Sequence, residues 1–562
     1  MTTRGMALRV LGAVALLAIA ACKRDVSTDP SATTVTSAAV ESEAPAVVIS
    51  KTAKLAATAM STVVYAAPAD TAKKIGYLRL GAVVPRTDKS YGIEGCPGGW
   101  YGVAPRGFVC VGKNATLETD SPLIRAASVR PDTSKPLPYS YGFIRAVAPL
   151  YLRVPTKEEQ LATEFKLTEH LAFWNRKGKQ ANHAEHVGAN DAAHEIILDA
   201  PTQPPSSTLS DAILLGGTSD ADPPPFWLEG GARKIPNVSG FEVPAKAIFA
   251  NRVRRHTGIA FIGSLATGAE SENRPFAMTV DMRLVPMDKV KPEPASPFHG
   301  VEVKGDVKLP LAFARPCNPN AKGTPRPCVH TYRDDGGELK RTDNVLPTRG
   351  LLQLTGAQRR GKNDVRFLEA NGGVWVRASD VGVAVVPSAW PQAAQRGEKW
   401  VDVSIEEQTL VLWDGKTPTY ATVVSTGQDG LEDPKKTKAT PLGTFRIKSK
   451  HITTTMDSNG RSAQSGGAAP ESGESGSPTD DDKHAGNFEL RDVPYVQYFQ
   501  DGYALHSAYW HDHFGLARSH GCINMAPIDA LRVFRFTDPP VPEGWHGTNV
   551  ESGKGTMVVI HR

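Results

Sequence analysis

Short segments of alternating apolar and polar residues, separated by glycine and proline, recur along this 562-residue chain. Trp400–Trp413 and Thr419–Gly427 alternate as successive strands of a sheet do, and so does much of Phe249–Val290. Lys74–Val84 and Gly99–Cys110 are shorter runs of the same kind. The pattern predicts a mainly β protein. The length exceeds what one core accommodates, so we expect three or four domains.

A histidine, a glycine-containing turn and a cysteine lie close together near the C-terminus, at His506 and in Ser519–Asn524. Cysteine attacks as its thiolate, and a nearby imidazole can take the thiol proton and return it to a leaving amine. Gly521 lets backbone approach Cys522, and N–H groups among residues 519–522 are candidate donors to an oxyanion. The alternative is a structural thiol beside a satisfied strand histidine.

This stretch resembles the signature of the L,D-transpeptidase (YkuD) family: a His, a spacer, then Ser/Thr-His-Gly-Cys, a hydrophobic residue and Asn or Arg. A second element, Thr440–Phe445, matches the Thr-Pro-x-Gly-x-Phe sequence that members carry upstream. The resemblance covers about the last third of the chain and implies a β-rich catalytic domain over residues 396–562. It also implies that Cys522 is the nucleophile and that His506 is its base.

The same resemblance implies supporting roles for the neighbouring residues. Ser507 would orient the imidazole through its backbone carbonyl, and His520 and Ser519 would shape the site. Asn524 would brace the loop. The spacer at 507–518 is shorter than in many relatives, which leaves these supporting roles open.

Two further features lie inside the catalytic region. Pro527–Phe536 predicts a short amphipathic helix, with proline at its start and Asp529 in its first turn. Asp457–Gly486 is rich in Gly, Ser, Pro and Asp, which predicts a disordered insertion. We expect this insertion to border the substrate cleft, so that its deletion alters substrate access without unfolding the domain.

The N-terminus resembles a lipoprotein signal peptide over residues 1–21. Arg4 and Arg9 precede an apolar run that is too short to span a membrane and ends at Ile19-Ala20-Ala21-Cys22. The resemblance implies lipid attachment at Cys22, and an ordinary secretory signal is the alternative. Residues 22–61 read as a flexible tether. We expect a periplasmic protein of the cell envelope, and Lys23 after the lipidated cysteine favours the outer membrane.

Four other cysteines form two local pairs, Cys96 with Cys110 and Cys317 with Cys328. Each pair closes a short loop and lacks the spacing of a zinc site, so structural disulfides in an oxidising compartment are predicted. Crossed connectivity stays open at this stage.

The rest of the chain divides into three regions. Residues 62–118 resemble a small bacterial SH3-like barrel, and residues 301–392 resemble the same module more weakly. Such modules bind peptide or wall material, or act as spacers. Between them, residues 119–300 are mixed, mostly β and of unknown role. Thr156–Gly178 predicts a helix there, with Thr156 and Glu159 at capping-box spacing.

No metal, cofactor or nucleic acid is expected. His183, His186 and His194 lie in a polar segment that reads as exposed, and His511-Asp512-His513 reads as a solvated turn. The net charge of +5 is spread without a basic run.

Together these features predict an exported, lipid-anchored transpeptidase acting on peptidoglycan stem peptides. Attachment of an envelope protein to the wall and hydrolysis are alternatives with the same nucleophile. A non-catalytic tether that binds peptidoglycan is an alternative of a different class.

Overall fold

The computed structural model describes residues 47–175, 210–238, 243–244, 246–317, 326–457 and 489–562. The predicted signal peptide and Cys22, the first part of the tether, His183, His186 and His194, and residues 458–486 of the predicted insertion lie outside this range. Residues 47–562 form one compact unit. The first strand of the described residues begins at Lys54, inside the segment predicted as a tether.

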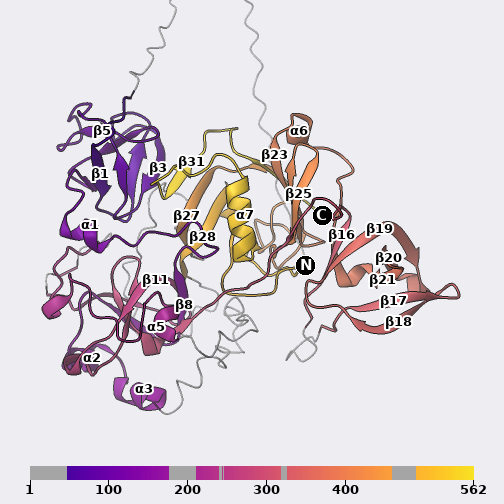
Figure 1. Cartoon of the computed structure of the whole chain (residues 1–562), viewed down its shortest axis with the longest axis horizontal. Coiled ribbons are helices and arrows are strands. Elements are labelled where there is room, and N and C mark those ends of the chain that lie inside the picture. The colour runs from indigo at the N-terminus through magenta and orange to yellow at the C-terminus, as the bar shows by residue number, and fades with distance from the viewer. Residues whose placement is uncertain (1–46, 176–209, 239–242, 245, 318–325, 458–488) are drawn as a thin grey trace, which may run out of the picture. The chain divides into compact units, whose positions relative to one another are not determined.

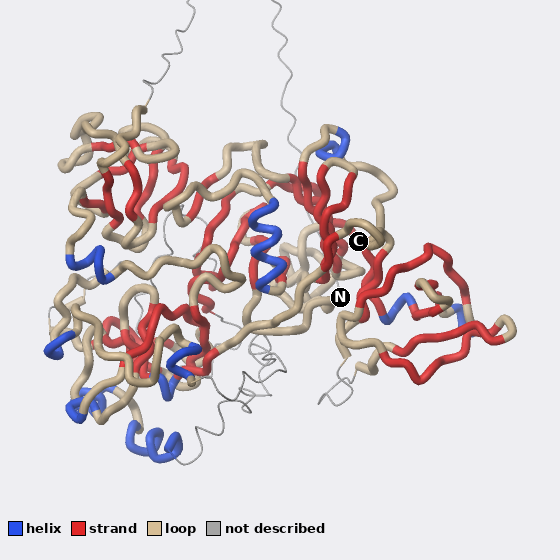
Figure 2. Tube along the Cα trace, in the orientation of Figure 1, coloured by secondary structure: helices blue, strands red, loops and turns tan. Residues whose placement is uncertain are grey.

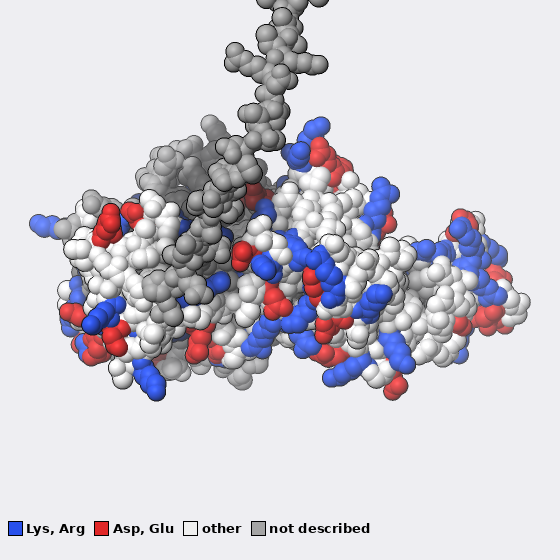
Figure 3. Space-filling view, turned by 90° about the horizontal axis from the view of Figure 1, so that it is seen from above, with Lys and Arg blue, Asp and Glu red and all other residues white. Residues whose placement is uncertain are grey.

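The expected mainly β, multidomain architecture is confirmed, with 38% strand against 12% helix. The strands of the described residues form four sheets, of three, sixteen, six and seven strands (Figures 1 and 2). Among the described helices, none is long and apolar enough to cross a bilayer. On the face shown in Figure 3, basic and acidic side chains are intermixed, in keeping with the small net charge.

The first part of the described chain is built from seven short strands. They are β1 (Lys54–Ala57), β2 (Thr62–Tyr65), β3 (Lys74–Leu78), β4 (Val83–Pro85), β5 (Trp100–Gly102), β6 (Phe108–Cys110) and β7 (Ala115–Thr116). Cys96 is disulfide-bonded to Cys110, as predicted. The core of this part includes Trp545 from the C-terminal region, and β3 pairs with β31 (Gly547–Asn549). These strands therefore share both a core and a sheet with the C-terminal region.

The middle region combines short helices with an antiparallel meander. Its elements are α1 (Pro122–Ala126), β8 (Ser140–Ile144), β9 (Ala148–Tyr151), α2 (Lys157–Thr163), α3 (Leu167–Phe173), α5 (Asp211–Leu214), β10 (Phe249–Val253), β11 (Gly258–Leu265), β12 (Phe276–Thr279), β13 (Leu284–Pro286) and β14 (Val290–Pro292). Both halves of the predicted capping box at Thr156 and Glu159 are present at the start of α2.

The helical segment expected from Thr156 onward is divided into two helices, because α2 stops at Thr163. Glu164 adopts an extended conformation, and its buried carboxylate accepts hydrogen bonds from Arg274 Nη1 at 2.7 Å and Lys289 Nζ at 2.6 Å. A buried carboxylate must be paired, and this requirement overrides the local helical pattern. The chain then resumes as the separate helix α3.

Residues 301–392 contribute the seven-stranded sheet. Its strands are β16 (Leu311–Ala314), β17 (His330–Asp335), β18 (Glu338–Val345), β19 (Leu351–Arg360), β20 (Arg366–Ala370), β21 (Val374–Arg377) and β22 (Val381–Ala384). The short strand β15 (Val301–Glu302) instead pairs with β25 (Thr417–Val423) of the C-terminal region. Cys317 is disulfide-bonded to Cys328, so both predicted local pairs are confirmed.

The C-terminal region contains two sheets and one long helix. Its elements are α6 (Gln392–Gln395), β23 (Lys399–Ser404), β24 (Thr409–Asp414), β25 (Thr417–Val423), β26 (Gly443–Arg446), β27 (Ser449–Asp457), β28 (Glu489–Gln500), β29 (Tyr503–Ser507), β30 (Ile523–Met525), α7 (Pro527–Phe536), β31 and β32 (Met557–His561). The helix α7 spans the residues predicted for it, and it packs beside β28 and β29 (Figure 1).

Candidate active site

The predicted base and nucleophile lie on adjacent parallel strands. In the register of β29 and β30, His506 is opposite Asn524 and Leu505 is opposite Ile523. Cys522 directly precedes β30, and its thiol approaches the backbone of Ala504, two residues before His506 on β29.

The imidazole of His506 is held in one tautomer. The residue is 3% exposed, and its Nδ1 lies 3.0 Å from the carbonyl oxygen of Ser507. A carbonyl only accepts, so Nδ1 carries the proton and Nε2 carries the lone pair. Burial lowers the pKa of His506 to about 4. At neutral pH the ring is therefore an uncharged base.

Cys522 is a free thiol that keeps part of its surface exposed. Its Sγ lies 3.6 Å from the carbonyl oxygen of Gly502, in the turn between β28 and β29. Desolvation raises the pKa of Cys522 to about 11. At neutral pH the site thus holds a thiol and an uncharged imidazole rather than an ion pair, so the proton has to leave as the sulfur attacks.

The loop before β30 is fixed by Ser519. Its Oγ accepts a hydrogen bond from Gly521 N at 3.0 Å and donates to the carbonyl oxygen of Cys522. The N–H of Ser519 itself donates to Thr426 O at 2.9 Å. These contacts occupy two of the N–H groups considered as oxyanion donors, and they make Ser519 a loop-shaping residue. Burial, with Lys438 nearby, lowers the pKa of His520 to about 4, so this ring is also uncharged.

Gly521 has a φ of +114°, and an added Cβ would come within 2.7 Å of the Tyr503 ring and 3.1 Å of the Ala439 carbonyl oxygen. Both the backbone conformation and the available space therefore require glycine here.

Thr440, the first residue of the Thr-Pro-x-Gly-x-Phe element, holds the nucleophile loop. Its hydroxyl donates to Gly521 O at 2.8 Å and accepts from Gly427 N at 2.8 Å, and the residue is 1% exposed. The sequence motif marked this threonine without indicating a role. The structure assigns it a brace between the two motif segments.

The prediction of a solvated turn at His511–His513 is wrong. His511 is 1% exposed and packs against Phe514, with ring centroids 4.7 Å apart. Its Nε2 lies 3.2 Å from the side-chain amide of Asn524, so Asn524 contacts the loop that it was expected to brace. Burial among cationic neighbours lowers the pKa of His511 well below its usual range.

Among the described residues, no group of three or more His, Cys, Asp or Glu side chains is arranged to hold a metal ion. His511 instead forms part of the packing that supports β30.

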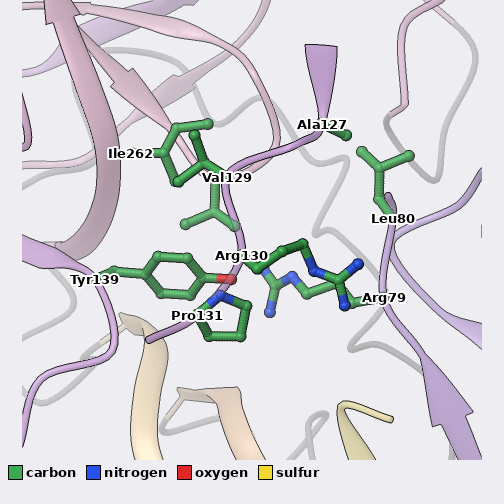
Figure 4. Close-up of a pocket in the computed structure, with 9 residues that line it drawn as sticks. Arg79, Leu80, Ala127, Val129, Arg130, Pro131, Tyr139 and Ile262 are labelled. Carbon is green, nitrogen blue, oxygen red and sulfur yellow. The ribbon is translucent and has the colours of Figure 1, made fainter. Parts of the chain in front are cut away.

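Two hollows lie outside the Cys522 loop. The first is lined by Arg79, Leu80, Ala127, Val129, Arg130, Pro131, Tyr139, Ile262 and Val280 (Figure 4). It contains none of the predicted catalytic residues, and burial together with neighbouring Arg79 lowers the pKa of Arg130.

The second hollow, of about 400 Å³, is lined by Phe445–Lys448, Phe499, Gln500 and Val550–Gly553. Gln500 ends β28, and neither Cys522 nor His506 is among the residues that line this second hollow.

Comparison with known families matches residues 398–560 to the YkuD family, described as the L,D-transpeptidase catalytic domain. No curated protein matches the chain.

Among solved structures, an Enterococcus faecium L,D-transpeptidase variant is 19% identical, with 29% of this chain and 49% of that chain covered and a TM-score of 0.19. L,D-transpeptidase 3 from Mycobacterium tuberculosis, with a faropenem-derived adduct, is 19% identical over 37% of this chain and 78% of that chain, with a TM-score of 0.20. The Mycobacterium smegmatis enzyme is 17% identical over 48% of this chain and all of that chain, also at 0.20.

The chain spans about half the length of the first two solved structures that it matches, at 49% and 54%. The family match over 398–560, and not these fold scores, supports the assignment. Both motif segments, Thr440–Phe445 and Ser519–Asn524, fall within the matched range. Residues 398–560 are therefore an L,D-transpeptidase catalytic domain of the YkuD family.

Proposed function

We propose that this protein is an exported peptidoglycan L,D-transpeptidase in which Cys522 is the nucleophile and His506 the general base. The observation that carries the proposal is the His506 imidazole, held by the Ser507 carbonyl on a strand that pairs with the strand directly after the free thiol of Cys522. The family match at 398–560 supplies the substrate class, peptidoglycan.

In the proposed first step, Sγ of Cys522 attacks the carbonyl of the third residue of a donor stem tetrapeptide. His506 Nε2 takes the thiol proton during the attack, because the thiol pKa of about 11 leaves little thiolate at neutral pH. The tetrahedral intermediate collapses, the protonated base returns the proton to the leaving amine of D-Ala, and a thioester remains.

In the second step, an amine of a neighbouring stem attacks the thioester. The same imidazole accepts the amine proton and returns one to sulfur, which restores the thiol and leaves an amide cross-link between third residues. No metal or nucleotide is needed for either step.

Export is proposed on two grounds. The N-terminal sequence resembles a lipoprotein signal with Cys22 as the lipidated residue, and the two disulfides favour an oxidising compartment. We place the protein on the periplasmic side of the envelope, anchored in the outer membrane. Attachment of an envelope protein and hydrolysis differ only in the acceptor, an amine of a protein or water.

The test uses the full chain with a disaccharide-tetrapeptide and mass spectrometry of both products and intact protein. A cross-linked dimer, an acyl adduct and released D-Ala, all absent from Cys522→Ala, are the expected results. Ser552→Ala, on the rim of the second hollow, is a control that keeps the nucleophile.

Shortened products without dimer would identify a hydrolase. If neither an acyl adduct nor turnover is observed, the transpeptidase proposal is contradicted. That result would favour the non-catalytic wall tether, in which Cys522→Ala would leave function in the cell intact.

A further inference from the structure

The loop between the base and the nucleophile is held by a residue from the 301–392 region. Arg349 Nη1 donates to the backbone carbonyl of Asp512 at 2.6 Å, and Nη2 donates to the Asp512 carboxylate at 2.8 Å. The two side chains are only 10% and 18% exposed. Ser296 also donates to the Asp512 carboxylate. A desolvated, two-point contact of this kind is geometrically strict.

A second arginine from the same region holds the loop three residues further on. Arg315 Nη1 donates to the carbonyl of Gly515 at 3.0 Å, and its Nη2 donates to Glu406 O at 3.0 Å. Arg349 also lies over the Phe298 ring, 4.7 Å from its centroid, and Phe298 stacks with Phe514. The loop is therefore fixed at residues 512, 514 and 515 by groups outside the matched catalytic range.

From this loop, contacts lead directly to the strand opposite His506. His511 Nε2 lies 3.2 Å from the side-chain amide of Asn524, and Ser425 Oγ donates to the carbonyl of His513 at 3.3 Å. Ser425 and Asn524 exchange two backbone hydrogen bonds of 2.9 Å. Asn524 is the residue paired with His506. Any shift of the loop thus acts on the residue that fixes the base relative to the nucleophile.

We infer that Arg349 is a positioning residue of the active site. Its hydrogen bonds to Asp512 hold the loop, and the loop keeps Asn524, and therefore Cys522, in register with His506. This role differs from wall binding or spacing. Its effect on turnover rests on the proposed transpeptidase function, whereas its effect on the loop and on β30 does not.

The test compares Arg349→Ala, Arg349→Lys and Arg359→Ala in the full chain. Arg359 is the matched control. It pairs with Asp334 at 2.7 Å within the seven-stranded sheet, but its side chain is 34% exposed and has no contact with the Asp512 loop among those of the described residues. The readouts are kcat and KM for D-Ala release, normalised to folded protein, and hydrogen exchange followed by mass spectrometry.

For Arg349→Ala we expect kcat to fall by about 10- to 100-fold with little change in KM, as misplacement of reacting groups predicts. Arg349→Lys should recover part of the loss, and Arg359→Ala should match the parent protein. Hydrogen exchange should accelerate at 508–518 and at 522–525, and stay unchanged in β32. Should Arg349→Ala fail to fold, Arg349→Lys and Asp512→Asn decide the question, both with smaller losses in kcat expected.

An unchanged kcat in the folded variant, or an equal loss in Arg359→Ala, would overturn the inference. So would faster exchange confined to 508–518, because the loop would then move without affecting β30. If the parent protein releases no D-Ala, the proposed function fails, and the exchange at 522–525 alone decides the positioning role.

Discussion

At the scale of single residues, the two reacting groups are both uncharged at neutral pH, and this sets the pH dependence. His506 accepts a proton only when neutral, and its pKa is lowered to about 4. Activity should therefore fall as the pH drops through about 4 and hold through neutral pH. The measurement is the pH–rate profile of D-Ala release.

His506→Gln should reduce the rate by about 10²- to 10⁴-fold. His451→Gln is the control, because burial also lowers the pKa of His451 to about 4 but this ring contacts Tyr77 and Ser449 rather than the thiol. An acidic limb near pH 6.5, the ordinary value for histidine, would contradict the assignment of His506.

Gly521 provides a second test at the residue scale. Gly521→Ala combines a left-handed backbone conformation with a contact of 2.7 Å to the Tyr503 ring, so we expect lost activity and about 1–3 kcal/mol lower stability. Gly553→Ala is matched in backbone, with a φ of +80°, but its Cβ would meet nothing within 4 Å. Thermal unfolding and turnover are measured for both variants. The difference between them separates the effect of backbone strain from that of the contact with the Tyr503 ring. Equal effects would show that the contact is unimportant.

At the scale of elements, α7 depends on Lys450 of β27. Burial lowers the pKa of Lys450 to about 7, and its Nζ donates to the carbonyls of Phe534 and Thr537, both at 2.7 Å, and so caps the C-terminus of the helix. Lys450→Met would leave these buried acceptors without their donor, at a cost of about 2–3 kcal/mol in unfolding free energy. Urea titration measures the change. Lys448→Met, at the exposed neighbouring lysine, should leave the midpoint unchanged, and similar losses would refute the capping role.

The elements also show where sequence patterns suffice. The helix at 527–536 was predictable because its proline start, acidic first turn and apolar spacing are all local. The end of α2 was not predictable, because the buried Glu164 carboxylate pairs with Arg274 and Lys289, which lie more than 100 residues away in the chain. The residues of the active site likewise fall into those that a sequence motif marks and those that only the structure reveals. Cys522, His506 and Thr440 lie in recognisable motifs, whereas the role of Arg349 depends on a contact that no local pattern encodes.

At the scale of the whole molecule, the regions within residues 47–562 pack together as one compact unit. Trp545 completes the core of the first strands, and β3 pairs with β31. A buried ion pair joins the same two regions: Arg79 contacts Asp492, and the side chains are 10% and 13% exposed. Loss of one partner of this pair would therefore leave an uncompensated buried charge at the junction of the two regions.

Asp492→Ala tests this coupling, because it leaves the Arg79 guanidinium desolvated with only neutral partners, Thr453 Oγ1 and His546 Nε2, both at 3.0 Å. Removing one member of a buried pair costs about 3–5 kcal/mol, so we expect a loss of that size in urea unfolding followed by tryptophan fluorescence. Asp501→Ala, which breaks the exposed pair with Lys448, should leave the midpoint in place. Since Arg79 and Asp492 belong to regions that share one core, the unfolding of both regions should shift together, and a loss confined to the first strands would show that they unfold independently.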